Sequence, residues 1–176
     1  HVLGAEVPLQ WTPPGSQQSF DRHHPIGDVV LLAKNREGYA NLCRLLTDAH
    51  LTAGERDDRD NPWTTLDVLA EHAKDLICLT GSDEGLLYPL MDAGMSMLAG
   101  QLTGALKEIF DDRLFVELTH QRRKGDDRRL GRLIRHAAQA GIPTVATGDV
   151  RYALPRDYWR YDLLTCIRHG ITVFED

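Results

Sequence analysis

Short apolar segments alternate with amphipathic segments along the whole chain, and this alternation limits the folds available to it. The apolar segments cover 2–9, 28–34, 76–80, 113–119 and 142–147. The segments between them carry apolar residues every three or four positions, which predicts helices. Strands that alternate with helices are typical of an α/β protein with a parallel sheet, either closed as a barrel or doubly wound. Segments 28–34 and 76–80 are predicted to be buried on both faces of that sheet.

Local signals predict where the helices begin and end. Asn35 is predicted to cap the first helix, and Thr64 or Thr65 the next, with Thr64 and Asp67 forming a capping box. Further helices are predicted over 86–92, 96–110 and 126–140, with Gly141 ending the last of these. Pro155 is predicted to start a final helix, and loops are predicted over 10–27 and 54–62.

The helix periodicity also predicts which side chains face inward. In the first helix these are Tyr39, Leu42, Cys43, Leu46 and Ala49. In the helix over 126–140 they are Leu130, Leu133, Ile134 and Ala137, and in the final helix Trp159, Leu163, Cys166 and Ile167.

Composition excludes several classes of protein. The 176 residues suit one domain, and 42% hydrophobic with 26% charged residues argues against a disordered chain. No apolar run approaches the roughly 20 residues of a membrane span. Because Lys plus Arg is 20 and Asp plus Glu is 26, the net charge of −6 argues against a free-standing nucleic-acid binder. The chain starts at His1, so we expect a piece of a longer protein.

The three cysteines are widely spaced and form no CxxC motif. We expect Cys43, Cys78 and Cys166 to be buried free thiols, which fits a reducing cytoplasm. Adjacent His23 and His24 lie in a predicted loop. The remaining helical histidines are expected on solvent faces: His50, His72, His136 and His169.

Functional groups in parallel α/β folds gather where strands end. The candidates there are Glu6, Asp28, Ser82, Glu117 with His120, and Asp149 with Arg151. Asp149 is either a metal ligand or general base, or a loop carboxylate that caps the next turn, and Arg151 offers it an ion pair. Glu117 points either into a barrel mouth or towards water, and His120 is either a ligand or an exposed loop side chain.

A basic segment follows the fourth apolar segment. It contains Arg122, Arg123, Lys124, Arg128, Arg129, Arg132 and Arg135. Helical spacing places Arg128, Arg132 and Arg135 on one face, which either meets a phosphate backbone or acidic partner or is simply solvated. Phosphate-loop and nucleophile-elbow motifs are absent.

Five segments resemble, in order and spacing, the PHP (polymerase and histidinol phosphatase) domain of bacterial DNA polymerase III alpha subunits. Residues 28–42, DVVLLAKNREGYANL, resemble the family's "hLVLLAxNxxGYxNL" stretch. Residues 145–152, VATGDVRY, resemble "VATNDVHY", while 4–7, 79–81 and 114–118 resemble "GAEv", "LSG" and "FvEl". The resemblance fits the replicative and error-prone branches equally.

The resemblance implies a distorted (β/α)7 barrel with up to three zinc or manganese ions at its mouth. The barrel is expected to be incomplete, because the opening HxHxxxS segment is absent. Glu6 and Asp149 agree with the family's ligands, whereas Asp28, Ser82 and Arg151 replace His, Cys and His. A hydroxyl and a guanidinium weaken metal binding, so we expect a degenerate site. Such a site holds either no cofactor at all, or zinc or manganese at low occupancy. Glu117 and His120 remain additional candidates.

The resulting hypothesis is a PHP-like domain over 1–176, with 155–176 leading towards a polymerase region that holds magnesium. It is expected to be inactive alone, to act as a cytoplasmic scaffold, and to dock a proofreading exonuclease, with DNA reached through the parent chain. The alternatives are a metal-dependent phosphoesterase or 3′–5′ exonuclease, and a free-standing α/β interaction module.

Overall fold

The computed structural model describes residues 2–13, 26–55, 62–83 and 85–173. The strands in these residues are β1 Gly4–Gln10, β2 Gly27–Ala33, β3 Thr64–Thr65, β4 Leu76–Leu79, β5 Leu114–Thr119 and β6 Thr144–Thr147. The helices are α1 Arg36–Glu55, α2 Leu66–His72, α3 Leu87–Asp92, α4 Ser96–Phe110, α5 Asp126–Ala140 and α6 Tyr158–His169. Short 3₁₀ turns cover Asp111–Arg113 and Pro155–Asp157.

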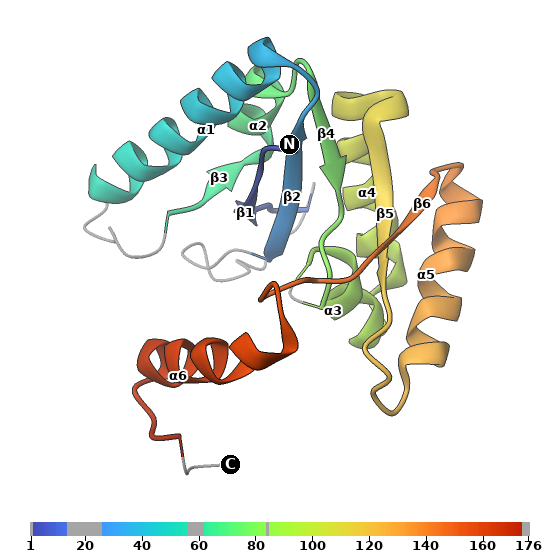
Figure 1. Cartoon of the computed structure of the whole chain (residues 1–176). Coiled ribbons are helices and arrows are strands. Elements are labelled where there is room, and N and C mark those ends of the chain that lie inside the picture. The colour runs from blue at the N-terminus through green and yellow to red at the C-terminus, as the bar shows by residue number, and fades with distance from the viewer. Residues whose placement is uncertain (1, 14–25, 56–61, 84, 174–176) are drawn as a thin grey trace.

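The described strands form one mixed sheet in the order β3-β1-β2-β4-β5-β6 (Figure 1). This order leaves β3 and β6 at opposite edges, so the α/β sheet does not close, in keeping with an incomplete PHP-type barrel. The prediction of an all-parallel sheet is wrong, because β2 pairs antiparallel with both β1 and β4. The sequence itself predicts a loop over 10–27 between these two strands, whereas parallel neighbours are usually joined through a helical crossover.

Strand β2 is the reversed strand of the described sheet, since β3 is parallel to β1, and β4, β5 and β6 are parallel to one another. Strand β3, which the sequence pattern did not predict, lets α2 act as an ordinary crossover into β4. The start of β2 therefore lies at the edge where the neighbouring strands end. This geometry explains how Asp28, at a strand start, comes close to residues at strand ends.

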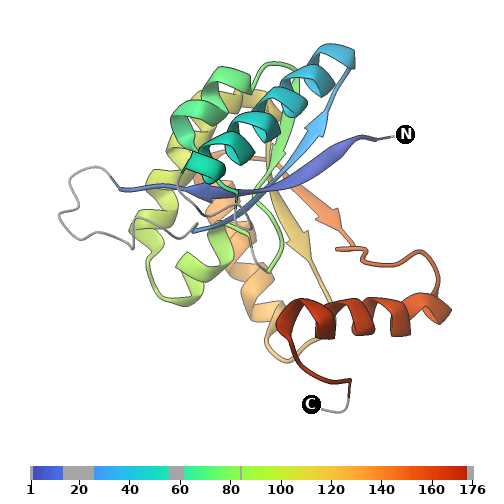
Figure 2. The same cartoon turned by 90° about the vertical axis from the view of Figure 1, so that its left-hand side faces the viewer.

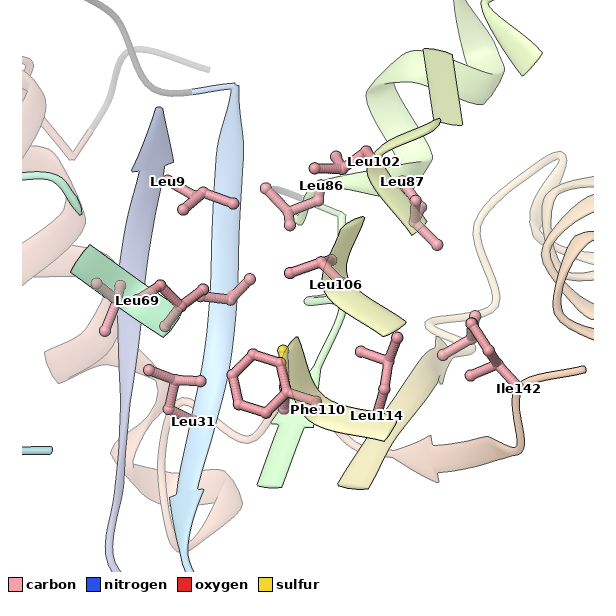
Figure 3. Packing of buried hydrophobic residues seen from close by; sticks show 14 of the residues in the cluster. Leu9, Leu31, Leu69, Leu86, Leu87, Leu102, Leu106, Phe110, Leu114 and Ile142 are labelled. Atoms are coloured by element: carbon pink, nitrogen blue, oxygen red, sulfur yellow. The ribbon is translucent and has the colours of Figure 1, made fainter. Parts of the chain in front are cut away.

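Helices α1, α4 and α5 pack along one face of the sheet (Figure 2). The core between the layers holds alternate strand side chains such as Val29 and Leu31 against Leu102, Leu106 and Phe110 from α4 (Figure 3). The prediction that β2 is buried on both faces is wrong, because Val30 and Leu32 are only half-buried. Helices in the described residues cover one face, and the opposite face of β2 lacks such a layer.

Helix caps follow local chemistry. The Asn35 side-chain oxygen accepts a hydrogen bond from Gly38 N at 2.9 Å, which caps α1 as predicted. Thr65, not Thr64, caps α2 by accepting from Val68 N at 3.4 Å, so the predicted capping box is wrong. Gly141 ends α5 with φ 64°, a left-handed conformation that glycine adopts without strain.

Several inward-facing predictions are wrong. Tyr39 and Cys43 are exposed on α1, where Leu45 and Ala53 are buried instead. Cys43 is therefore not a buried thiol, unlike Cys78 and Cys166. Ile134 on α5 is exposed as well. The apolar side predicted for α6 is also exposed, apart from Cys166: Trp159, Leu163 and Ile167.

Two histidines depart from the predicted solvent position. His136 is half-buried and bonded to the Thr103 hydroxyl at 2.8 Å, and His72 is bonded to Asp48 at 2.8 Å. His23, His24 and most of the loops predicted over 10–27 and 54–62 lie outside the described residues. Within the described part of the chain, no helix has the length and apolar content to cross a membrane.

Candidate functional site

A cleft of about 520 Å³ lies where the segments after β4, β5 and β6 meet. Its walls combine polar side chains from these segments with aromatic rings at the entry to α6. The lining side chains include Ser82, Asp83, Gln121, Arg123, Asp149, Arg151, Tyr152, Tyr158 and Tyr161. The strand-end candidates Ser82, Asp149 and Arg151 thus line one cleft.

Arg151 links two of the predicted carboxylates. One guanidinium nitrogen lies 2.8 Å from Asp149 Oδ1, and another lies 3.5 Å from Glu6 Oε2. Asp149 is largely shielded from solvent, whereas Glu6 and Arg151 are partly exposed. The ion pair that Arg151 offered to Asp149 is therefore present, and it extends across 145 residues of sequence to Glu6 on β1.

Asp149 is held on both sides of its carboxylate. Gln121 Nε2 donates to Asp149 Oδ2 at 3.1 Å, while Arg151 pairs with Oδ1. The backbone of Asp149 is left-handed, with φ 45°, an uncommon conformation that aspartate tolerates better than most side chains. The carboxylate is therefore a fixed element of the cleft, with both oxygens occupied by protein donors.

Glu117 lies beneath this cluster on β5 and is 6% exposed. Thr147 donates its hydroxyl hydrogen to Glu117 Oε1 at 2.5 Å, while Oε2 is buried without a hydrogen-bond partner in the described residues. Burial raises the pKa of Glu117, the Thr147 bond opposes that rise, and the carboxylates of Asp149 and Glu6 add to it. Of the two alternatives left open for Glu117, the inward one holds.

Asp28 and Ser82 lie near this cluster. Asp28 forms a bridge with Gly85, directly after the loop that carries Ser82. Gly81 makes the close approach between them: its φ is 78°, and a Cβ there would lie 2.5 Å from the Asp28 carbonyl oxygen. Asp28 thus meets the Ser82 loop through its backbone.

His120 and the basic segment form a second polar region. His120 is exposed and lies 3.2 Å from Asp127 on α5, so the structure does not bring it to Asp149. Burial favours a higher pKa for Asp126, but hydrogen bonds from Arg123 N and Gln121 N and the charge of Arg129 outweigh it, so the pKa is lowered. Asp126 therefore fixes the start of α5 as a buried anion.

Arg129 belongs to this internal network. Its guanidinium lies 2.6 Å from Asp83 and 3.0 Å from Asp126, and it stacks 4.6 Å from the centre of the Tyr88 ring. Arg129 is consequently withdrawn from any phosphate contact. Arg123 pairs with Asp83 at 2.7 Å, and Arg132 lies 3.6 Å from Asp92. Within the basic segment over 122–135, the exposed basic side chains that form no side-chain ion pair with the described residues are Arg122, Lys124, Arg128 and Arg135.

The donor set fits a metal ion poorly. A permanently charged guanidinium stands between the carboxylates of Glu6 and Asp149, where it repels a divalent cation. Ser82 supplies a neutral hydroxyl, a poor ligand for zinc. Across the described ranges, no group of three or more His, Cys, Asp or Glu side chains has the arrangement of a metal site.

Several cleft residues were missed by reasoning from sequence. Gln121 and Asp83 follow directly after the candidates His120 and Ser82, so adjacency alone would have suggested them. Below the cleft, Thr147 at the end of β6 and Thr119 at the end of β5 have hydroxyls 3.2 Å apart, a contact between strands that sequence reasoning also missed. No local sequence pattern indicated the cleft tyrosines. The Tyr152 ring reaches the rings of Tyr158 and Tyr161 because the chain turns between Tyr152 and α6.

Sequence comparison matches residues 1–121 to the PHP domain. The mixed α/β sheet is consistent with this match. The chain therefore belongs to the PHP domain family. It is similar to the DNA polymerase III subunit alpha of Caulobacter vibrioides, at 32% identity over 99% of this chain and 15% of that protein. It is also similar to an error-prone DNA polymerase of Anaeromyxobacter dehalogenans, at 32% identity over 98% of this chain and 13% of that protein.

A third relative is the DNA polymerase III subunit alpha of Haemophilus influenzae, at 28% identity over 98% of this chain and 14% of that protein. The chain thus spans between 13% and 15% of the length of these relatives. The similarity to PHP-bearing polymerases expected from the five motif segments is confirmed.

Proposed function

We propose that the chain is the PHP domain of a polymerase of the DNA polymerase III alpha type, and that it serves DNA replication as a scaffold and docking domain. The polymerase relatives, each matched over nearly the whole of this chain, support this assignment. Under this proposal, DNA and magnesium are bound by the rest of the parent chain, a proofreading exonuclease is a docking partner, and the complex works in the cytoplasm.

The observation that carries the scaffold role is the position of Arg151. Its guanidinium bridges Glu6 and Asp149, so these carboxylates neutralise a protein cation instead of a divalent ion. In metal-dependent phosphoester cleavage the ion activates water and binds phosphate oxygens. A guanidinium binds phosphate oxygens but does not lower the pKa of a bound water as a metal ion does, so the cleft has a structural role in this proposal.

Metal analysis of the full-length polymerase chain tests this proposal. After dialysis into metal-free buffer, we expect zinc plus manganese far below one ion per chain, and an unfolding temperature unchanged by a chelator. The metal content and the unfolding temperature are also measured for Arg151→Ala and for the control Arg156→Ala, which removes an arginine outside the cleft. Near-stoichiometric zinc or manganese in the wild-type chain would contradict the degenerate site.

A second candidate function is a metal-dependent phosphoesterase or 3′–5′ exonuclease. The unpartnered Oε2 of Glu117 favours it, because a buried acceptor of this kind is rare without a ligand or ordered water. This alternative predicts shortening of single-stranded DNA from the 3′ end by the full-length chain, lost in Glu117→Gln. A free-standing module would instead require a coding sequence that stops near residue 176.

A further inference from the structure

Helix α6 carries an apolar stripe that faces solvent. Trp159, Leu163 and Ile167 recur every four residues and are 59%, 41% and 67% exposed. Leu164 lies beside them and is 65% exposed. We call these four side chains the α6 stripe. The periodicity predicted this apolar side, but in the described residues no element covers it.

The opposite side of α6 contacts the segment that precedes the helix. The Tyr152 ring, in the segment before the helix, lies 5.8 Å from the Tyr158 ring and 6.0 Å from the Tyr161 ring. At 100° per residue, Tyr158 and Tyr161 fall roughly opposite the centre of the stripe. Figures 1 and 2 both show α6 standing apart from the sheet. The helix thus contacts the preceding segment on one side and presents the stripe outward on the other.

Continuity of the apolar surface indicates the direction of its partner. Ile171 and Val173, just beyond α6, are 45% and 48% exposed. The apolar surface therefore continues along the path by which the chain leaves the domain. Contiguous exposed apolar surface of this kind marks an interaction site.

We propose that the α6 stripe packs against the region of the same polypeptide that follows residue 176. This inference rests on the proposed function, because it requires the chain to be one domain of a longer polymerase. The relatives extend over a chain of which this domain is only 13% to 15%. A region linked through residues 170–176 is present at a high effective concentration, so it has an advantage over a separate molecule.

Cysteine labelling in the full-length chain tests the contact. Ile167→Cys places a thiol in the stripe, and Met97→Cys places one on α4 at a comparable starting exposure of 76%. We expect Ile167→Cys to react with a maleimide at least about tenfold more slowly than Met97→Cys in the native chain, and equally fast in denaturant. The exposed native Cys43, quantified by peptide mass spectrometry, is the internal reference.

Equal native rates at the two positions would overturn the proposal. Protection that disappears when the chain is diluted to a monomer, as measured by sedimentation, would assign the stripe to a second copy instead. Protection that arises only after the exonuclease subunit is added would assign it to that subunit. Either result overturns the intrachain contact.

A charge substitution provides a second measurement on the same full-length chain. We expect Ile167→Asp to lower the unfolding temperature, whereas Met97→Asp leaves it unchanged. An unchanged temperature for both variants contradicts the proposal. DNA synthesis on a primed template tests the proposed function separately. A full-length chain that protects the stripe but does not synthesise DNA would contradict the polymerase assignment and still support the intrachain contact.

Discussion

Arg151 sets the charge balance of the cleft at the scale of single residues. It is one cation shared by two ion-paired carboxylates, Glu6 and Asp149. Glu117 contributes a third carboxyl group below them, and its raised pKa follows first from burial. The protein thus limits negative charge in two ways, by an internal counter-ion and by disfavouring ionisation of the buried acid.

His136 gives a pH-dependent prediction. Burial lowers its pKa below the ordinary value of 6.5, so the folded state binds a proton less readily than the unfolded state. Stability is therefore expected to fall as pH decreases through 6.5 towards the lower folded-state pKa. Gln at this position keeps a donor for Thr103 without titrating, so His136→Gln is expected to remove this part of the loss.

Urea unfolding of both proteins at pH 7.5, 6.5 and 5.5 measures the effect of His136. Asp92 and the basic side chains Arg132 and Arg135 line the same cleft as His136, so both proteins are compared at fixed ionic strength. His50, which is exposed, supplies the control variant His50→Gln. Identical pH profiles for wild type and His136→Gln would contradict the prediction.

At the scale of elements, helix bounds followed from local chemistry and were predicted well. The bounds of α4 and α5, Ser96–Phe110 and Asp126–Ala140, match those expected from sequence. Helix capping and glycine stops depend on neighbouring residues, so a sequence contains them. The exposure of Cys43 and Ile134 depends instead on which elements cover each face, and helical periodicity alone cannot fix that.

The same distinction explains the site. The sequence alone predicted that Asp149 and Arg151 lie together, because both residues follow the same strand in one short loop. Contact between Glu6 and Arg151 joins the first strand to the segment after the last described strand, so only the tertiary fold establishes it. Strand direction was the main error: the loop predicted over 10–27 offered no helical crossover between β1 and β2, and β3, only two residues long, escaped prediction.

The cap of α1 yields an element-scale prediction. Asn35→Ala removes the acceptor for Gly38 N and is expected to lower the free energy of unfolding by about 1 kcal/mol. The matched control is Arg36→Ala at the exposed first residue of α1, which leaves the cap intact. Chemical denaturation compares the two, and equal losses would show that the Asn35 side chain does not stabilise the helix.

At the scale of the whole molecule, the ion pair between Glu6 and Arg151 links distant parts of the chain. A double-mutant cycle with Glu6→Gln and Arg151→Gln is expected to give a coupling energy of roughly 0.2–1 kcal/mol, because both groups are partly exposed. The coupling should shrink at high salt. Glu37 and Arg44, a more exposed pair 3.9 Å apart within α1, form the control cycle.

Zero coupling between Glu6 and Arg151 at low salt would contradict their role as a link across the sheet. A coupling equal to that of the Glu37–Arg44 control would show that the tertiary contact adds no more than a local helical pair. Thermal unfolding of the four proteins of each cycle supplies both values.

The sequence separation of Glu6 and Arg151 also orders events during synthesis. Their separation of 145 positions corresponds to about 7 to 30 s of translation at rates of roughly 5–20 residues per second. Strands β1 and β2 both end by Ala33, so they can pair before the guanidinium of Arg151 is made. During synthesis, the carboxylate of Glu6 therefore lacks this counter-ion until Arg151 has been made.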